Sequence, residues 1–147
     1  MGKKILVLED DLPSLKLVKE ILINYGYAVL EANAKGGVGT AQFAAAVLEA
    51  TDGLQAIHLA EKEKPHLAIV DIMLPTLNGY QVCEKLRSIP VLKSMPIIVL
   101  TVLNEDQHRI RAIEAGATDF LIKPFDRVEL ITKIKALLSI QEELSHR

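Results

Sequence analysis

The chain has 147 residues, of which half are apolar and 24% are charged, and its formal net charge is −2. This composition is typical of one globular domain, and the charge gives no general reason to expect nucleic-acid binding. No apolar stretch approaches the length of a membrane span or of a signal-peptide core, so we expect a cytoplasmic protein without a membrane partner. The single cysteine, Cys83, cannot form an internal disulfide, and we expect it to be buried on a helix.

Short apolar runs alternate with helical stretches along the chain. Strands are predicted at Lys4–Leu8, 28–31, Leu67–Asp71, Ile97–Thr101 and 120–122. Apolar residues at helical spacing predict helices that begin near residues 13, 52, 80 and 105, and a last helix around 130–138. Strict alternation predicts an α/β fold, a parallel sheet with helices on both faces. We expect one domain over residues 1–147, in which residues 140–147 prolong the last helix.

Carboxylates stand at the ends of two predicted strands. Glu9, Asp10 and Asp11 follow the first strand, and Asp71 closes the third. Because chemistry in open parallel sheets gathers at the carboxyl ends of the strands, these acids meet in one shallow pocket if the two strands are neighbours. Carboxylates at such short range repel each other unless a hard cation joins them, and Mg²⁺ is the usual one. The pattern therefore predicts a magnesium site.

Two further strand ends carry groups that suit an anion held against such an ion. Thr101 offers a hydroxyl at the end of the fourth strand, and Lys123 offers an ammonium at the end of the fifth. A phosphoryl group fits this set of groups. Asp71 is then the candidate nucleophile, because carboxylates form acyl phosphates and a metal ion neutralises charge as the phosphoryl group arrives.

Four motifs thus stand in order at the ends of successive strands. They are Ile5-Leu6-Val7-Leu8-Glu9-Asp10-Asp11, Val70-Asp71-Ile72-Met73-Leu74-Pro75 with Gly79, Val99-Leu100-Thr101, and Phe120-Leu121-Ile122-Lys123-Pro124-Phe125. Together they resemble the receiver domain of two-component response regulators, over almost the whole chain. The resemblance implies a flavodoxin-like, doubly wound sheet of five parallel strands in the order 2-1-3-4-5.

The resemblance also implies roles for single residues. Asp71 would accept a phosphoryl group from the phosphohistidine of a sensor histidine kinase or a phosphotransfer protein. Mg²⁺ would be bound by the side chains of Glu9, Asp10 and Asp71 and by the main-chain carbonyl of Met73.

Other roles implied by the resemblance concern the switch. Lys123 and Thr101 would contact the phosphoryl oxygens, and Phe120 matches the aromatic residue that swings inward when Thr101 is drawn to the phosphate. Lys123-Pro124 matches the cis peptide of the family, a bond that is rare outside X-Pro. The chain would then be a phosphorylatable switch and no enzyme beyond its own phosphotransfer and dephosphorylation. Its output surface would lie around the fourth helix, fifth strand and fifth helix and would bind a downstream protein, with no DNA-binding domain in the chain.

Three residues depart from the usual receiver pattern. Val102 stands where a small residue normally follows the threonine, which narrows access to the phosphoryl group. Met73 and Leu103, two positions beyond Asp71 and Thr101, are both apolar and cannot orient an attacking water. We therefore expect slow self-dephosphorylation.

A larger departure is an insertion of eighteen residues at 33–50, whose last two residues, Glu49-Ala50, repeat Glu31-Ala32. It begins with a Gly-rich turn at 33–40, and strong helix formers with a narrow apolar stripe predict an extra helix at 41–50. That helix could pack at the sheet edge, extend the second helix or mediate homodimer formation, or it could serve as the arm of a docking module in which phosphorylation is impaired. Residues 35–40 resemble a deviant Walker A loop without its lysine, which leaves nucleotide binding as a further alternative.

Overall fold

The computed structural model of the chain describes residues 3–9, 11–29, 31–32, 38–39, 53–72, 78–102 and 106–145. Strands and helices alternate along most of this range. In chain order they are β1 (Lys4–Leu8), α1 (Leu12–Asn24), β2 (Ala28–Val29), β3 (Glu31–Ala32), β4 (Val38–Gly39), α2 (Gly53–Glu63), β6 (Leu67–Asp71), α3 (Gly79–Ser88), the 3₁₀ helix η1 (Pro90–Leu92), β7 (Ile97–Thr101), α4 (Asp106–Glu114), β8 (Asp119–Ile122) and α5 (Arg127–Ser145). The predicted α/β class is confirmed.

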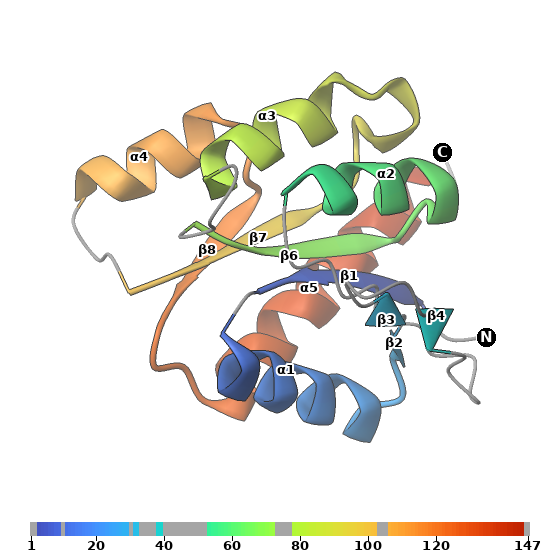
Figure 1. The fold of residues 1–147 in the computed structure, drawn as a ribbon, viewed down its shortest axis with the longest axis vertical. Helices are drawn as coiled ribbons and strands as arrows, with labels where there is room; N and C mark the ends of the chain where they lie inside the picture. Colours follow the sequence, from blue (N-terminus) through green and yellow to red (C-terminus); the bar gives the residue numbers. More distant parts are fainter. Residues whose placement is uncertain are drawn as a thin grey trace.

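The main sheet is parallel throughout and has the strand order β2-β1-β6-β7-β8. β1 and β6 are neighbours in register, with Leu8 opposite Val70, so the two acid-bearing strand ends lie side by side. Figure 1 shows α2, α3 and α4 on one face of the sheet and α1 on the other. β6 and β7 are buried along their whole length, as expected for strands covered on both faces.

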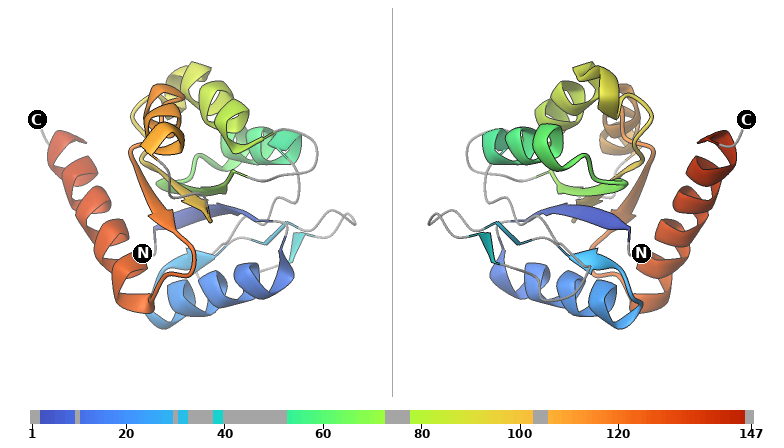
Figure 2. Two further views of the ribbon diagram at one scale, coloured as in Figure 1. Left: turned by 90° about the vertical axis from the view of Figure 1, so that its left-hand side faces the viewer. Right: turned by 90° about the vertical axis from the view of Figure 1, so that its right-hand side faces the viewer.

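Two hydrophobic cores lie on opposite sides of the sheet, because successive side chains of a strand point to opposite faces. The core beneath α2, α3 and α4 includes Leu6 and Leu8 of β1, whereas the core beneath α1 and α5 includes Ile5 and Val7. Cys83 belongs to the first core, which confirms that it is buried, and burial raises the pKa of its thiol to about 12. In the second core, α1 and α5 contact one another (Figure 2).

The predicted second strand is divided in the structure. Ala28–Val29 pair with β1, opposite Lys4 and Ile5. Glu31–Ala32 belong to a separate two-stranded sheet, in which they pair antiparallel with Val38–Gly39 of the insertion. Two residues of the insertion, Val38 and Gly39, therefore supply a hydrogen-bonding partner for Glu31–Ala32. The rest of the predicted Gly-rich turn and the predicted helix at 41–50 lie outside the described residues.

Within the part of the chain that the structure describes, we found no helix with both the length and the apolar character that crossing a membrane requires.

Candidate functional site

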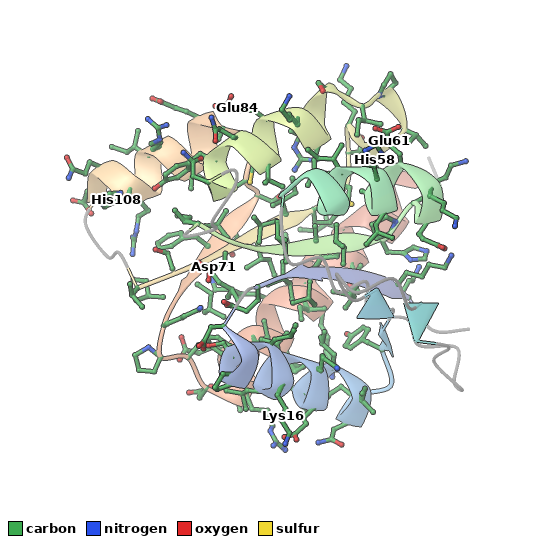
Figure 3. The ribbon with its side chains drawn as sticks, in the orientation of Figure 1. Lys16, His58, Glu61, Asp71, Glu84 and His108 are labelled. Atoms are coloured by element: carbon green, nitrogen blue, oxygen red, sulfur yellow. The ribbon has the colours of Figure 1, made fainter. Side chains whose placement is uncertain are left out.

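A lysine joins two buried carboxylates at the carboxyl end of the sheet. The Nζ atom of Lys123 lies 2.6 Å from Oε2 of Glu9 and 3.2 Å from Oδ2 of Asp71. Glu9 is fully buried and Asp71 is 6% exposed. Figure 3 shows Asp71 where β6 ends, beside the end of β1. Three residues from β1, β6 and β8 that the sequence predicted as neighbours are thus brought together.

Two residues of the acidic run after β1, Glu9 and Asp11, have different roles in the structure. Glu9 turns inward, and its Oε1 accepts a hydrogen bond of 3.1 Å from the main-chain N–H of Asp11. Asp11 turns outward and caps α1, because its Oδ2 accepts a 3.1 Å hydrogen bond from the N–H of Ser14. Hydrogen bonds with Ser14 hold the pKa of Asp11 below its usual value. Asp11 is therefore a helix cap outside the buried cluster, while Asp10 lies outside the described residues.

The cluster of Glu9, Asp71 and Lys123 holds two carboxylates and one ammonium. Burial and hydrogen bonding with Asp71 raise the pKa of Glu9 to about 7, although Lys123 acts in the opposite direction. Burial would lower the pKa of Lys123, but its hydrogen bonds and ion pairs with Glu9 and Asp71 outweigh burial and raise it. One ammonium does not fully compensate two adjacent carboxylates, so the donor set suits a hard divalent cation.

Fewer candidate metal ligands are seen than the sequence predicted. Among the described residues, no group of three or more His, Cys, Asp or Glu side chains is placed to hold a metal ion. Two of the predicted ligands, Asp10 and the carbonyl of Met73, fall in the part of the chain that the structure does not describe. Of the four predicted magnesium ligands, the structure therefore describes two, Glu9 and Asp71.

Gly79 lets α3 begin directly against the end of β6. Its N–H donates a 2.8 Å hydrogen bond to the carbonyl of Ile72. A Cβ atom at this position would lie 2.5 Å from the carbonyl oxygen of Asp71, so only glycine fits. A capping box between Asn78 and Gln81 starts the helix. The backbone that carries Asp71 is thereby held from the side of α3.

Thr101 and Lys123 are linked through their main chains. The N–H of Lys123 donates a 2.7 Å hydrogen bond to the carbonyl of Thr101, which is 2% exposed at the end of β7. The peptide bond between Lys123 and Pro124 is cis, as the resemblance implied. Phe120 is partly buried against the α2–α4 core, and the guanidinium carbon of Arg109 on α4 lies 4.3 Å from the centre of its ring. Phe120, three residues before Lys123 in the chain, therefore contacts α4.

A cavity of about 340 Å³ opens beside Lys123. Its lining comes from α1, the end of β7 and the segment after β8, namely Ser14, Leu17, Val102, Lys123, Pro124 and Phe125. Val102 is 59% exposed and Leu17 is 44% exposed. The side chain that replaces the usual small residue after Thr101 thus stands on the wall of an open cavity next to the cluster.

A family model described as the response regulator receiver domain matches residues 38–135. The chain belongs to this family. Among curated receiver-containing relatives, the alkaline phosphatase synthesis transcriptional regulatory protein PhoP of Bacillus subtilis is 34% identical over 142 residues, which cover 97% of this chain and 51% of PhoP. The probable transcriptional regulatory protein SilR of Salmonella typhimurium is 35% identical over 92% of the chain and 50% of SilR. The chain spans about half the length of these relatives.

Solved receiver structures share the fold. A putative response regulator from Chloroflexus aurantiacus has a TM-score of 0.79 and 29% identity, covering 95% of this chain and 99% of its own. The receiver domain of a sensor histidine kinase from Pseudomonas aeruginosa has a TM-score of 0.77 and 27% identity, with the same coverage, and was solved with a magnesium ion coordinated in its active-site cleft. Magnesium binding in this family agrees with the carboxylate cluster of the receiver described here.

Sequence reasoning missed several residues that shape the site. It treated Asp11 as part of the acidic cluster, although Asp11 followed by Pro13 and Ser14 is a typical start of a helix. It gave no reason for Gly79, and it did not anticipate Arg109. The sequence around Arg109 gives no sign of its partner, because Phe120 lies on another element, β8, and the two residues come together only when the chain folds.

Proposed function

We propose that this receiver domain stores a phosphoryl group on Asp71, taken from a phosphohistidine of a partner histidine kinase or phosphotransfer protein. The observation that carries the proposal is the position of Lys123, whose ammonium bridges Asp71 and Glu9. A cation held at that point is suited to pair with the oxygens of a phosphoryl group as it arrives at Asp71.

The transfer is a substitution at phosphorus. A carboxylate oxygen of Asp71 forms a bond to phosphorus while the P–N bond of the phosphohistidine breaks, and the leaving imidazole nitrogen keeps the electron pair and takes up a proton. Lys123 and the hydroxyl of Thr101 contact the phosphoryl oxygens of the product. Glu9 and Asp71, with Asp10 and the carbonyl of Met73, would hold Mg²⁺, which when bound supplies positive charge against the transferring group.

The donor and the target would use different faces. The cavity beside Lys123 has exposed apolar side chains, among them Leu17 and Val102, and we propose that the partner protein docks there, next to the lysine that contacts Asp71. The switch is then read at α4, β8 and α5. On α4, Ile110 is 58% exposed and Ile113 is 51% exposed, and such side chains suit a protein surface that binds and releases with phosphorylation.

Intact-mass measurement after incubation with acetyl phosphate and Mg²⁺ tests this function. We expect one phosphoryl group per chain, none in Asp71→Asn, and none when a chelator removes the metal. Asp119→Asn is the matched control. Asp119 also lies on a strand and pairs with a lysine, because its Oδ2 is 3.0 Å from Nζ of Lys133, but it is not part of the cluster of Glu9, Asp71 and Lys123. Equal labelling of Asp71→Asn and the unsubstituted chain would contradict the proposal.

A further inference from the structure

The first residue of β1, Lys4, is held on both of its main-chain polar groups by one residue, His66. The N–H of His66 donates a 2.8 Å hydrogen bond to the carbonyl of Lys4, and the N–H of Lys4 donates a 2.8 Å hydrogen bond to Nδ1 of the His66 ring. His66 directly precedes β6, so this contact lies at the amino ends of β1 and β6, where α2 ends (Figure 1). These are the opposite ends of the two strands from Glu9 and Asp71.

The imidazole of His66 takes the place of a main-chain acceptor. In a parallel pair of strands, carbonyls of one main chain accept from N–H groups of the other at even spacing. The register between β1 and β6 begins at Ile5 and Leu67, and the chain before β6 has already turned, because Lys64 has a φ of 49° and Pro65 follows it. The N–H of Lys4 is therefore paired with a side chain where a carbonyl would continue the ladder.

This contact fixes the protonation state of His66. A main-chain N–H can only donate, so Nδ1 carries a lone pair and the ring proton stands on Nε2. An imidazolium carries a proton on both nitrogens and has no acceptor. Protonation of His66 therefore breaks the hydrogen bond with Lys4 and places two donors against each other.

The edge strand β2 involves the same residue of β1. The described residues of β2, Ala28 and Val29, have Lys4 and Ile5 as their register partners on β1. Both partners stand at the amino end of β1, beside the residue that His66 holds. The attachment of Ala28–Val29 to the sheet is therefore coupled by contact to the state of His66.

We propose that His66 is a pH-sensitive catch for this edge of the sheet. While its ring is neutral, it holds the amino end of β1 and with it Ala28–Val29, and it releases both when the ring takes up a proton. The release is local, because a donor left without its acceptor destabilises the end of a strand well before the buried middle of the sheet opens.

The charges around His66 favour release in acid. The ends of β1 and α2 next to it carry three lysines and one glutamate, namely Lys3, Lys4, Lys64 and Glu63. Glu63 is engaged by Lys4, because its Oε2 lies 3.4 Å from Nζ of that residue. On the β7 side, Pro96 accepts a hydrogen bond from Ala68, and the segment that leads to it adds Lys93. A proton on His66 thus joins an excess of positive charge.

The catch should be closed at neutral pH and open in acid. Burial lowers the pKa of His66 from its ordinary value of 6.5, and the positive charges of Lys3 and Lys4 lower it further. The open form therefore takes up the proton more readily than the closed form. The contribution of the contact is complete above about pH 6.5 and is lost as the pH falls through the folded-state pKa.

Hydrogen exchange of the Lys4 amide, followed by NMR, measures the catch directly. After correction for the intrinsic pH dependence of exchange, its protection should fall by up to about tenfold for each pH unit between about pH 6.5 and the folded-state pKa. Protected amides within 28–29 should lose protection over the same range. The amide of Ile69, in the buried middle of β6, should keep its protection.

Three variants separate the ring from its charge. His66→Asn places an uncharged oxygen acceptor near the position of Nδ1, so Lys4 should stay protected at neutral pH and its protection should no longer depend on pH. His66→Ala removes the acceptor, and Lys4 should be poorly protected throughout. His58→Asn is the matched control, because His58 is exposed on α2 (Figure 3), and it should keep the pH dependence of the unsubstituted chain.

Nitrogen NMR of the His66 ring in the unsubstituted chain gives a readout that needs no substitution. The neutral ring should carry its proton on Nε2, and the ring should titrate at the pH where Lys4 loses protection. The proposal is overturned if the protection of Lys4 does not change as His66 titrates, or if His66→Asn keeps the original pH dependence. A proton on Nδ1 of the neutral ring would equally overturn it. None of these readouts depends on phosphorylation of Asp71.

Discussion

The carbonyl oxygen of Asp71 lies 2.5 Å from the point where a Cβ atom on Gly79 would stand. The Cα of Ile72 is almost as close, at 2.6 Å. Both neighbours are main-chain atoms of the segment that presents the candidate phosphoacceptor, so neither can move aside without moving that segment. The start of α3 and the position of Asp71 are therefore coupled by contact.

We predict that Gly79→Ala destabilises the fold by about 1–3 kcal/mol, the usual cost of inserting a methyl group where backbone must shift. Because the shift falls on Asp71, labelling by acetyl phosphate should slow as well. Urea unfolding and intact mass measure the two effects. Glu84→Ala is the control, since Glu84 is exposed on the same helix (Figure 3) and should change neither. Unchanged stability in Gly79→Ala would show that the contact relaxes freely.

The raised pKa of Glu9 predicts that magnesium binding depends on pH. A proton on Glu9 competes with the metal, and the pKa of about 7 places this competition near neutrality. Magnesium affinity measured by calorimetry should therefore rise between pH 5.5 and 7.5, by up to about tenfold per pH unit well below the pKa. Glu9→Gln should bind the metal more weakly, with much less dependence on pH.

The same shift has an opposite consequence for the metal-free protein. The folded-state pKa of Glu9 lies above its ordinary value of 4.5, so the folded chain holds this proton more tightly than the unfolded chain between about pH 4.5 and 7. The contribution of Glu9 to the free energy of unfolding should fall as the pH rises through this window. Denaturant unfolding in the presence of a chelator, compared with Glu9→Gln at each pH, isolates this contribution. A difference that grows in favour of the wild type with rising pH would contradict it.

Arg87 joins the end of α3 to the turns that precede β7 and β8, at the opposite end of these strands from the site. Its Nε donates a 2.8 Å hydrogen bond to the carbonyl of Gly116, its Nη2 lies 3.1 Å from Oγ1 of Thr118, and its Nη1 donates to the carbonyl of Met95. We predict that Arg87→Lys lowers the free energy of unfolding by about 2–3 kcal/mol, since one ammonium cannot reach all these acceptors. Lys85→Arg, at an exposed position of the same helix, should have no such effect in urea unfolding.

The phosphorylated protein should be long-lived. Met73 and Leu103 carry no polar group that could orient a water molecule toward the acyl phosphate. After removal of free acetyl phosphate, the phosphoprotein should therefore decay over many minutes when followed by intact mass. Met73→Asn, which introduces a polar side chain two positions beyond Asp71, should shorten this lifetime. Decay of the unsubstituted phosphoprotein within seconds would argue against the interpretation.

Some parts of the site could be predicted from the sequence because the responsible signals are local. Asp71 closes a continuous apolar run, and Lys123 follows another, so both could be assigned to strand ends without knowledge of the fold. Glu9 and Asp11 are different, because they stand two residues apart in one acidic run. Their side chains diverge through contacts with Lys123 and with Ser14, respectively, and the first of these contacts spans 114 positions of the chain.

The amino-acid sequence by itself determined the alternation of strands and helices and the polar residue at the end of each strand, because hydrophobic period and chain order are local properties. The tertiary structure alone decided that Asp11 turns away from the buried carboxylates to cap α1, and that Arg109 covers Phe120. These outcomes depend on contacts between segments that are distant in the chain, and a local sequence pattern does not specify such contacts.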